Sequence, residues 1–370
     1  MSDAPLLVIA AGGTGGHMFP AQSLAEEMLS RGWRVKLSTD SRGLRYAGGF
    51  PDAVPKRALS AATFARGGIR SKLIAPFRIG WGVVEACRWF AHDRPAAVAG
   101  FGGYPALPAL SGAMYHRIPR LIHEQNGVLG RVNRVFGARV DALACGTFPV
   151  TNAPEGANLI DMGNPIRDAT RDAMATPYAP PAAEGPIEVL VFGGSQGASV
   201  FADLLPSAIA ALPLEIRDRI RLTQQARPVE RDAVAAVYRS GGIEAEVEPF
   251  FDDMPRRIAS AQLVVCRAGA STIAELTAIG RPSILVPYPS AMDDHQTANA
   301  RPLADAGAAI LAPEAGLTAA GLAEHMRALI EEPGRAADMA ARARSLGRPD
   351  AAKRIADLVE DLAANGAKER

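Results

Sequence analysis

The sequence predicts an α/β protein made of two doubly wound, Rossmann-like domains that face a cleft. Near its start, the apolar run Leu6 to Ala11 leads into the glycine-rich turn Gly12 to Gly16 and then into a helical pattern. The same order restarts half a chain later with Ile187 to Phe192, which is apolar except for Glu188, and the turn Gly193 to Gly197. A chain of 370 residues is long enough for two domains that each bury a core.

The first domain opens with a predicted parallel βαβ unit. Apolar residues between Ala21 and Leu29 recur at helical spacing, and Gly32 ends that helix. Arg34 to Ser38 follows as a second strand, which pairs in parallel with the first when a helix connects the two. Such alternation of strands and helices is typical of α/β folds.

Each half also repeats a second pattern. In the first half, the predicted strands Ala97 to Gly103 and Arg120 to His123 flank a helix. In the second half, Leu263 to Gly269 and Ser283 to Pro287 flank another, and the helix Phe201 to Leu212 follows the glycine turn. Two halves of similar topology are therefore expected.

The domain boundary is expected near Pro165 or in the alanine- and proline-rich stretch Ala173 to Pro186, which lacks periodicity. This gives an N-terminal domain of residues 1–165 and a C-terminal domain of residues 166–345. A final segment, residues 346–370, carries a helical apolar stripe that is expected to pack back on the first domain.

Composition excludes several classes of protein. The formal net charge of +1 gives no argument for nucleic acid as a partner. The three cysteines, Cys87, Cys145 and Cys266, fit neither a disulfide framework nor a zinc site, which favours a reducing compartment. No apolar run approaches the roughly 20 residues that span a bilayer, so any membrane contact is expected to be peripheral.

The two glycine turns are predicted to bind phosphate. A turn between a strand and a helix leaves backbone N–H groups unpaired beside the positive helix end. Glycines that merely permit tight turns are the plain alternative. A dinucleotide fold is disfavoured because Met18 stands where the third glycine belongs, although Asp40 resembles its ribose-binding acid. No Gly-Lys-Ser/Thr follows either turn, which excludes a Walker loop.

Two residues of the first half are candidates for base chemistry. His17 adjoins the first glycine turn, where a helix is expected to begin, and Glu124 ends a nearby strand. Ligands of open α/β sheets bind at the carboxyl ends of strands. A histidine and an acid at one rim could share the work of a general base, although a lone histidine is more often structural.

In the second half, residues 266–272 lead from a strand into a helix that is expected to span Ile273 to Ile279. Ser271 or Thr272 would cap this helix in the plain structural interpretation. Glu275, expected in the first turn, would bond the hydroxyls of a ribose while the helix end faces a diphosphate. The acid pairs Asp252–Asp253 and Asp293–Asp294 lack an Asp-x-Asp arrangement, so we expect no required metal.

Taken together, a set of motifs resembles the MurG-type transferases, which make lipid II from lipid I in peptidoglycan synthesis. The set runs in order along nearly the whole chain: Gly12-Gly13-Thr14-Gly15-Gly16-His17, Gly102-Gly103-Tyr104, His123-Glu124-Gln125-Asn126, Gly163-Asn164-Pro165-Ile166-Arg167, Gly193-Gly194-Ser195-Gln196-Gly197-Ala198, Phe251-Asp252-Asp253-Met254, Cys266-Arg267-Ala268-Gly269-Ala270 and His295-Gln296 with Asn299. Ala268 and the residues before Gln296 depart from the family pattern, which affects details of donor contact.

The resemblance implies the GT-B fold and inverting transfer of N-acetylglucosamine (GlcNAc) from UDP-GlcNAc to the muramoyl 4-OH of lipid I, without a metal or other cofactor. It assigns the acceptor and the membrane to the N-terminal domain and the donor to the C-terminal domain. By motif match, the donor-binding residues would be Thr14, Gly15, Gly16, Asn126, Arg167, Ser195, Phe251, Ala270, Ser271, Thr272, Ile273, Ala274, Glu275 and Gln296. Partners would include UDP-GlcNAc, lipid I and other cell-wall synthesis and division proteins, at the cytoplasmic face of the bacterial inner membrane.

A local basic surface agrees with a membrane partner. Between Lys56 and Arg94 there are eight Lys or Arg residues against two acids, with aromatic and aliphatic residues interleaved. This mixture suits anionic headgroups, and an ordinary amphipathic core helix explains it equally well from the residues alone. The lipid-linked acceptor that the resemblance implies favours membrane docking through residues 64–90.

Two alternatives remain at this point. A sugar-nucleotide epimerase of the same fold would act on UDP-GlcNAc without a lipid. A non-catalytic scaffold would bind the lipid precursor without turnover.

Overall fold

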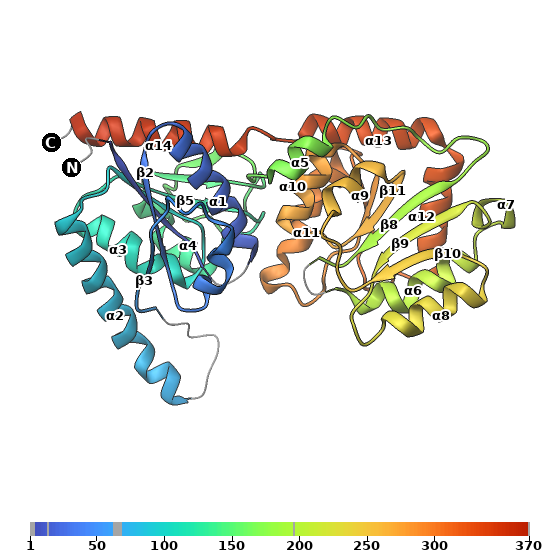
Figure 1. The fold of residues 1–370 in the computed structure, drawn as a ribbon, viewed down its shortest axis with the longest axis horizontal. Coiled ribbons are helices and arrows are strands. Elements are labelled where there is room, and N and C mark those ends of the chain that lie inside the picture. The colour runs from blue at the N-terminus through green and yellow to red at the C-terminus, as the bar shows by residue number, and fades with distance from the viewer. Residues whose placement is uncertain (1–3, 13–14, 62–68, 195–196, 369–370) are drawn as a thin grey trace. The chain divides into compact units, whose positions relative to one another are not determined.

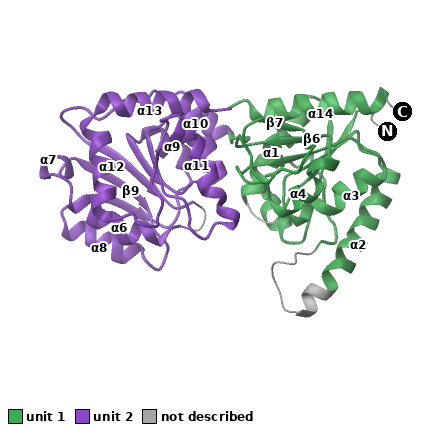
Figure 2. Cartoon of the chain, turned by 180° about the vertical axis from the view of Figure 1, so that it is seen from behind, with its two compact units in different colours: residues 1–167, 349–370 green, residues 168–348 purple. Residues whose placement is uncertain are grey.

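A computed structural model describes residues 4–12, 15–61, 69–194 and 197–368. The chain divides into two compact units: unit 1 comprises residues 1–167 and 349–370, and unit 2 comprises residues 168–348 (Figure 2). Each unit is a parallel sheet between layers of helices (Figure 1). The α/β class predicted from the repeated strand–turn–helix pattern is confirmed.

Unit 1 holds a seven-stranded parallel sheet in the order β3-β2-β1-β4-β5-β6-β7. Its strands are β1 (Leu6–Ala10), β2 (Arg34–Thr39), β3 (Lys56–Ala58), β4 (Ala97–Gly100), β5 (Arg120–Glu124), β6 (Ala142–Cys145) and β7 (Leu159–Asp161). Its helices are α1 (Gly15–Ser30), α2 (Ile69–His92), α3 (Leu107–Tyr115), α4 (Arg131–Phe136) and α14 (Ala351–Lys368), with 3₁₀ turns η1 (Gly43–Gly49), η2 (Tyr104–Ala106) and η3 (Gly137–Arg139).

The sheet of unit 1 is buried on both faces. Leu7 and Ile9 of β1 belong to one apolar cluster, while Leu6, Val8 and Ala10 belong to another. Alternate residues of a strand point to opposite faces, so a strand buried on both sides is a continuous apolar run. This is why Leu6 to Ala10 carries no polar residue.

Helix α14 completes one of these cores although it follows all of unit 2 in the chain. Ile355, Ala356 and Val359 are buried in the cluster that contains Leu7 and Ile9. The Arg31 guanidinium on α1 also pairs with carboxylates of α14, at 2.7 Å from both Asp357 and Glu360. The apolar stripe noted in the sequence therefore packs on unit 1.

Unit 2 holds a six-stranded parallel sheet in the order β10-β9-β8-β11-β12-β13. Its strands are β8 (Ile187–Phe192), β9 (Ile220–Gln225), β10 (Glu244–Glu248), β11 (Leu263–Cys266), β12 (Ser283–Leu285) and β13 (Ile310–Leu311). Its helices are α5 (Asp168–Ala173), α6 (Ser199–Ala210), α7 (Leu214–Arg217), α8 (Arg231–Ser240), α9 (Met254–Ser260), α10 (Ala270–Ile279), α11 (His295–Asp305), α12 (Ala319–Glu331) and α13 (Pro333–Leu346), with the 3₁₀ turn η4 (Met292–Asp294).

The stretch Ala173 to Pro186 is attached to unit 2 rather than forming a free linker. The Tyr178 hydroxyl donates to the Gln262 carbonyl at 3.0 Å, and the buried Arg281 guanidinium donates to the Thr176 carbonyl at 3.0 Å. The units divide after Arg167, close to the expected position at Pro165.

Both sheets share one topological feature. The strand order reverses between β1 and β4 in unit 1, and between β8 and β11 in unit 2. Open α/β sheets bind ligands at such switch points, at the carboxyl ends of the strands. The strands β1 and β8 end at the two switch points, and the glycine-rich stretches 12–16 and 193–197 follow them in the chain. Residues 13, 14, 195 and 196 of these stretches lie outside the described residues.

Candidate functional site

The first turn of α1 forms the rim of the unit 1 site. The helix begins at Gly15, six residues before the apolar pattern suggested, so Gly15, Gly16 and His17 lie in its first turn. The Gln125 side-chain amide donates to the Gly16 carbonyl at 2.7 Å and ties this turn to the end of β5. Thr14, an expected donor contact, lies outside the described residues.

His17 is placed where it can act as a base. Its side chain is partly exposed, but its Nδ1 atom is buried and has no hydrogen-bond partner among the described residues. Burial lowers the pKa of His17, and the nearby negative charge of Glu124 opposes that effect. The imidazole is therefore neutral, as a general base must be, at neutral pH.

Glu124 is buried within a set of four donors. Its Oε1 atom accepts from the Asn126 backbone N–H at 3.1 Å and from the Asn126 amide at 3.3 Å. Its Oε2 atom accepts from the Gly130 N–H at 2.9 Å and from the Asn133 amide at 2.8 Å. Because the protein itself satisfies this carboxylate, Glu124 is held in place as a fixed negative charge beside His17.

Gln125, Gly130 and Asn133 are site residues that were not expected from the sequence. Gln125 belongs to the motif His123-Glu124-Gln125-Asn126, so its position in the sequence already indicated a place near the site. Gly130 and Asn133 belong to the loop and the short helix after β5, and only the closure of that loop brings them to Glu124.

His123 supports the same rim from inside the core. Its Nε2 atom lies 3.0 Å from the Gly163 carbonyl, an acceptor only, so Nε2 carries the hydrogen. Its ring packs 5.2 Å from the ring of Phe101, and burial lowers the pKa of His123 to about 4. His123 is thus a neutral structural residue.

Two other predicted residues of unit 1 have protein partners. The Asn126 side-chain amide and backbone N–H both donate hydrogen bonds to Glu124 and so help to hold that carboxylate. The Arg167 guanidinium lies 5.6 Å from the ring centroid of Phe19 on α1.

Asp40 does not offer a free carboxylate to a ribose. Its Oδ1 atom accepts from the Gly43 N–H at 2.8 Å, and its Oδ2 atom accepts from the Tyr104 hydroxyl at 2.7 Å. Burial and Asp40 together raise the pKa of Tyr104. The resemblance of Asp40 to the acid of a dinucleotide fold is therefore not matched by its surroundings.

In unit 2, the residues before α10 are fixed by two side chains of α11. Gln296 Oε1 accepts from the backbone N–H groups of Ala268, at 3.2 Å, and Tyr288, at 2.9 Å. The fully buried Asn299 amide donates to the Ala268 carbonyl at 3.0 Å. With its oxygen occupied, Gln296 can offer a ligand only its NH₂ group.

The start of α10 differs from expectation. The helix begins at Ala270 with Gly269 as its N-cap, so Ser271 and Thr272 lie inside the first turn and neither caps it. Ala270 and Ile273 are buried, whereas Ser271, Thr272 and Ala274 are partly exposed. The N–H groups of a first turn without a side-chain cap remain available to an acceptor from outside.

Glu275 lies in the second turn of α10, not in the first. Its side chain is buried, and its Oε1 atom lies 3.4 Å from the Thr170 hydroxyl on α5. Phe251 is buried as well, with the Arg257 guanidinium 4.2 Å from its ring centroid. Because the phenyl ring is buried and has no hydrogen-bonding group, only the main chain of Phe251 can form a hydrogen bond to a ligand.

Gly193, the first residue after β8, has no room for a side chain. A side chain on Gly193 would meet the backbone N of Ala198 at 2.4 Å, and Gly194 has a φ of +79°. The Gly193 N–H donates to Gln225 Oε1 at 3.1 Å. Ser195, predicted to contact the donor, lies outside the described residues.

At least one acid of each pair singled out in the sequence has a protein partner. Asp253 pairs with Arg256 and Arg257, and Asp294 accepts from the Thr297 hydroxyl at 2.7 Å. Over the described ranges, no group of three or more His, Cys, Asp or Glu side chains is arranged to hold a metal ion.

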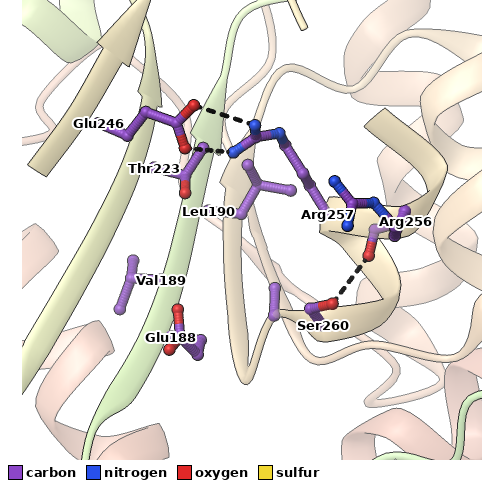
Figure 3. A pocket seen from close by; sticks show the side chains of 9 residues that line it. Glu188, Val189, Leu190, Thr223, Glu246, Arg256, Arg257 and Ser260 are labelled. Carbon is purple, nitrogen blue, oxygen red and sulfur yellow. Dashed lines mark hydrogen bonds and ion pairs between the residues drawn. The ribbon is translucent and has the colours of Figure 1, made fainter. Parts of the chain in front are cut away.

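A hollow of about 350 Å³ on unit 2 has none of the predicted donor-binding residues in its lining (Figure 3). Glu188, Thr223 and Glu246 line it from the sheet, and Arg257 pairs with Glu246 across it. These two charged side chains of the lining are therefore paired with each other.

Comparison with known proteins gives consistent matches. The description of the glycosyltransferase family 28 N-terminal domain matches residues 7–145, and that of the family 28 C-terminal domain matches residues 188–355. A protein of Rhodopseudomonas palustris named "UDP-N-acetylglucosamine--N-acetylmuramyl-(pentapeptide) pyrophosphoryl-undecaprenol N-acetylglucosamine transferase" is 47% identical, over 98% of this chain and 100% of its own length.

Solved structures agree. The crystal structure of Acinetobacter baumannii MurG superposes with a TM-score of 0.80 at 29% identity, covering 96% of this chain and 99% of that one. The glycotransferase of kitacinnamycin superposes with a TM-score of 0.72 at 18% identity, covering 98% and 100%, and shows a shared fold alone.

Proposed function

Because the chain belongs to the MurG family of N-acetylglucosamine transferases, we propose that it transfers GlcNAc from UDP-GlcNAc to the 4-OH of the muramoyl sugar in undecaprenyl-diphospho-muramoyl-pentapeptide. The products are lipid II and UDP, and the reaction serves peptidoglycan synthesis. The two parallel-sheet units have the GT-B architecture of this family. Unit 1 would hold the acceptor and unit 2 the donor.

The observation that carries the proposal is the pairing of a neutral His17 with the fixed charge of Glu124 at a switch point. His17 takes the proton of the acceptor hydroxyl as its oxygen attacks the anomeric carbon, and the bond from that carbon to the diphosphate breaks. Glu124 stabilises the imidazolium that forms and acts through His17. A positioned base of this kind contributes roughly 10²- to 10⁴-fold in rate.

The departing diphosphate gathers negative charge as the bond breaks. The N–H groups in the first turn of α10, which no side chain caps, and the glycine-rich stretch after β8 are suited to hold that charge. Amides fixed in advance stabilise the transition state without rearrangement, so we propose that transfer requires no metal. Glu275 and the Phe251 main chain would contact the nucleoside, and the Gln296 NH₂ group would contact the sugar.

The remaining expected donor contacts stay part of the proposal. They are Thr14, Gly15, Gly16, Asn126, Arg167, Ser195, Ala270, Ser271, Thr272, Ile273 and Ala274.

Transfer of radiolabelled GlcNAc to purified lipid I in the presence of a chelator tests reaction and metal independence together. Labelled lipid II is the expected product. Epimerised sugar from donor alone would support the epimerase alternative, and lipid I binding without turnover would support the scaffold. An unchanged transfer rate in the His17→Ala, Glu124→Ala double variant would refute the assignment of the base.

We also propose that α2 docks on an anionic membrane surface. Ile74, Phe77, Trp81 and Val84 are exposed and lie on one face of the helix, and Phe77 is 81% exposed. The C-terminal half of α2 packs against α3, while its N-terminal half extends away from the sheet (Figure 1). Of the expected docking segment 64–90, residues 64–68 lie outside the described residues.

Basic residues accompany this apolar face. Arg78 is exposed, and the Arg88 guanidinium lies 6.0 Å from the Trp81 ring centroid. Aromatic and basic side chains on one helix suit the headgroup region. In the described part of the chain, no helix is long and apolar enough to cross a bilayer.

Co-sedimentation with vesicles rich in anionic lipid tests this docking. The Phe77→Ser, Trp81→Ser double variant should lose binding, while Val237→Ser, an exposed apolar residue of unit 2, should keep it. Equal binding by both variants would refute the role of α2. Association with other cell-wall synthesis and division proteins remains a proposal from the family alone.

A further inference from the structure

A basic groove lies between α4 and the loop that follows β6. Its volume is about 530 Å³, and it is lined by Arg131, Arg134, Val135, Asn152, Ala153 and Pro154. None of these residues is acidic. The groove thus offers two guanidinium groups, an amide and some apolar surface.

Several contacts build this groove into the fold. The Thr151 N–H donates to the Gly127 carbonyl at 2.8 Å, and the Leu129 N–H donates to the Thr151 carbonyl at 2.9 Å. These bonds join the segment after β5 to the segment after β6. Both walls therefore leave the carboxyl ends of adjacent parallel strands, the edge at which such sheets bind ligands.

The two arginines are oriented toward solvent. Arg131, Arg134 and Val135 are all exposed, and the structure gives the Arg131 side chain no hydrogen bond or ion pair with any described residue. A guanidinium binds a carboxylate through two parallel hydrogen bonds, so these side chains suit a ligand that carries carboxylates.

The groove lies within reach of the proposed base. Asn133, on the same short helix as the two arginines, donates to Glu124 at 2.8 Å from its buried side. Exposed and buried sides of a helix are separated by its width, about 10–12 Å with side chains. The groove is thus about one helix width from the carboxylate that supports His17.

The chemistry of the acceptor provides an anion at that distance. A muramoyl sugar carries its peptide through a lactyl ether on C3, the carbon next to the reacting C4 hydroxyl. An extended peptide of five residues spans about 17 Å at 3.3–3.6 Å per residue. A peptide that starts beside the reacting hydroxyl can therefore place its carboxylates in the groove.

We propose that Arg131 and Arg134 form a subsite for the carboxylates of the acceptor's peptide. This inference rests on the proposed function and extends it to recognition of the stem. The arginines bind the peptide, whereas His17 acts on the reacting sugar. The arginines therefore increase the affinity for the acceptor and take no part in the chemical step.

The test compares two acceptors in the full-length protein. One is lipid I with its pentapeptide, and the other is the same lipid-linked sugar with the peptide removed at the lactyl group. In the Arg131→Gln, Arg134→Gln double variant, kcat/KM for the pentapeptide acceptor should fall roughly 10- to 100-fold, as expected for loss of hydrogen bonds between charged groups. The value for the peptide-free acceptor should not change.

Controls separate this role from others. Arg117→Gln removes an exposed arginine before β5, at the opposite edge of the sheet, and should behave like wild type on both acceptors. A pentapeptide acceptor with amidated carboxylates should lower kcat/KM of the wild type as far as the double substitution does. Binding of the double variant to anionic vesicles should equal that of wild type.

Three results would overturn the subsite. An equal loss on both acceptors would place the arginines on the lipid diphosphate, and weaker vesicle binding would place them on lipid headgroups. An unchanged kcat/KM on both acceptors would show that the two arginines do not contribute to acceptor recognition. Wild-type turnover of the peptide-free acceptor would leave the proposed transfer reaction standing in each of these cases.

Discussion

Gln296 and Asn299 lie one turn apart on α11 and hold the two polar main-chain groups of the same residue. Gln296 accepts from the Ala268 N–H, and Asn299 donates to the Ala268 carbonyl. One peptide segment is thereby fixed two residues before α10 begins. The direction in which that helix presents its first N–H groups depends on these two amides.

Replacing Asn299 should weaken donor binding. Asn299→Ala leaves the buried Ala268 carbonyl without its partner, which costs about 1–3 kcal/mol, and releases the segment before α10. We expect a higher Kd for UDP by calorimetry. Asn158→Ala removes a comparable 2.9 Å amide-to-carbonyl bond in unit 1 and should not alter UDP binding. An unchanged Kd in Asn299→Ala would contradict this role.

Gln296 offers a way to separate support of the loop from contact with the sugar. Gln296→Glu keeps an oxygen for the Ala268 and Tyr288 N–H groups but lacks the NH₂ group. We expect a raised KM for UDP-GlcNAc and an unchanged Kd for UDP. Gln296→Met, which lacks both functions, should raise both. If Gln296→Glu raises the Kd for UDP as much as Gln296→Met does, the NH₂ group has no role separate from support of the loop.

Gly102 determines the space beside His17. It has a φ of +77°, and an added Cβ would lie 3.0 Å from His17 Cε1. Gly156 has the same φ with open space around it, so both alanine variants carry the left-handed penalty of about 1–2 kcal/mol. Only Gly102→Ala should lower kcat. Equal kcat in the two variants would show that the imidazole position is not critical.

The pH profile of kcat should identify His17 as the base. Because burial lowers the pKa of His17, kcat should be flat above pH 6.5 and fall only at lower pH. Glu124→Gln removes a charge that raises that pKa, so the acid limb should move to still lower pH. Asn133→Ala keeps the charge and should leave the limb in place. An unmoved limb in Glu124→Gln would argue against the pairing.

His123 should make unit 1 less stable in acid. Its pKa is about 4 when folded and near 6.5 when unfolded, so between these values the unfolded chain binds a proton that the folded chain does not. The free energy of unfolding should therefore fall as the pH drops through this window, by about 3 kcal/mol in total from this residue.

Urea unfolding followed by tryptophan fluorescence can measure that loss, since Trp33, Trp81 and Trp89 all belong to unit 1. His123→Gln should show a smaller loss of stability between pH 7 and pH 5 than wild type. The same pH dependence in both proteins would exclude His123 as its source. His17, whose pKa is also lowered by burial, reduces the stability in acid as well, but it is present in both wild type and His123→Gln and does not affect their difference.

The sequence allowed the fold to be predicted because the first strand of each unit, β1 and β8, is a largely apolar run followed by a glycine-rich stretch and a helix. The start of α10 escaped prediction because tertiary bonds from Gln296 and Asn299, rather than a capping side chain, fix the residues before it. Local sequence favoured Ser271 or Thr272 as a cap.

The candidate site was predictable in part for a related reason. His17 and Glu124 adjoin strand ends, which the sequence reveals. The donors that surround Glu124 reach it only when the loop before α4 closes, and Asp40 is satisfied by Tyr104 from 64 positions away. Such long-range partners leave no periodic trace in one sequence.

The placement of α14 has a consequence for how the protein is made. Unit 1 needs Ile355, Ala356 and Val359 to complete its core, yet the ribosome translates these residues only after all of unit 2. Domains usually fold in the order of synthesis, N-terminal first. Here the continuous unit 2 has its full set of residues earlier, and the part of the N-terminal apolar core that α14 covers stays exposed until translation passes α14.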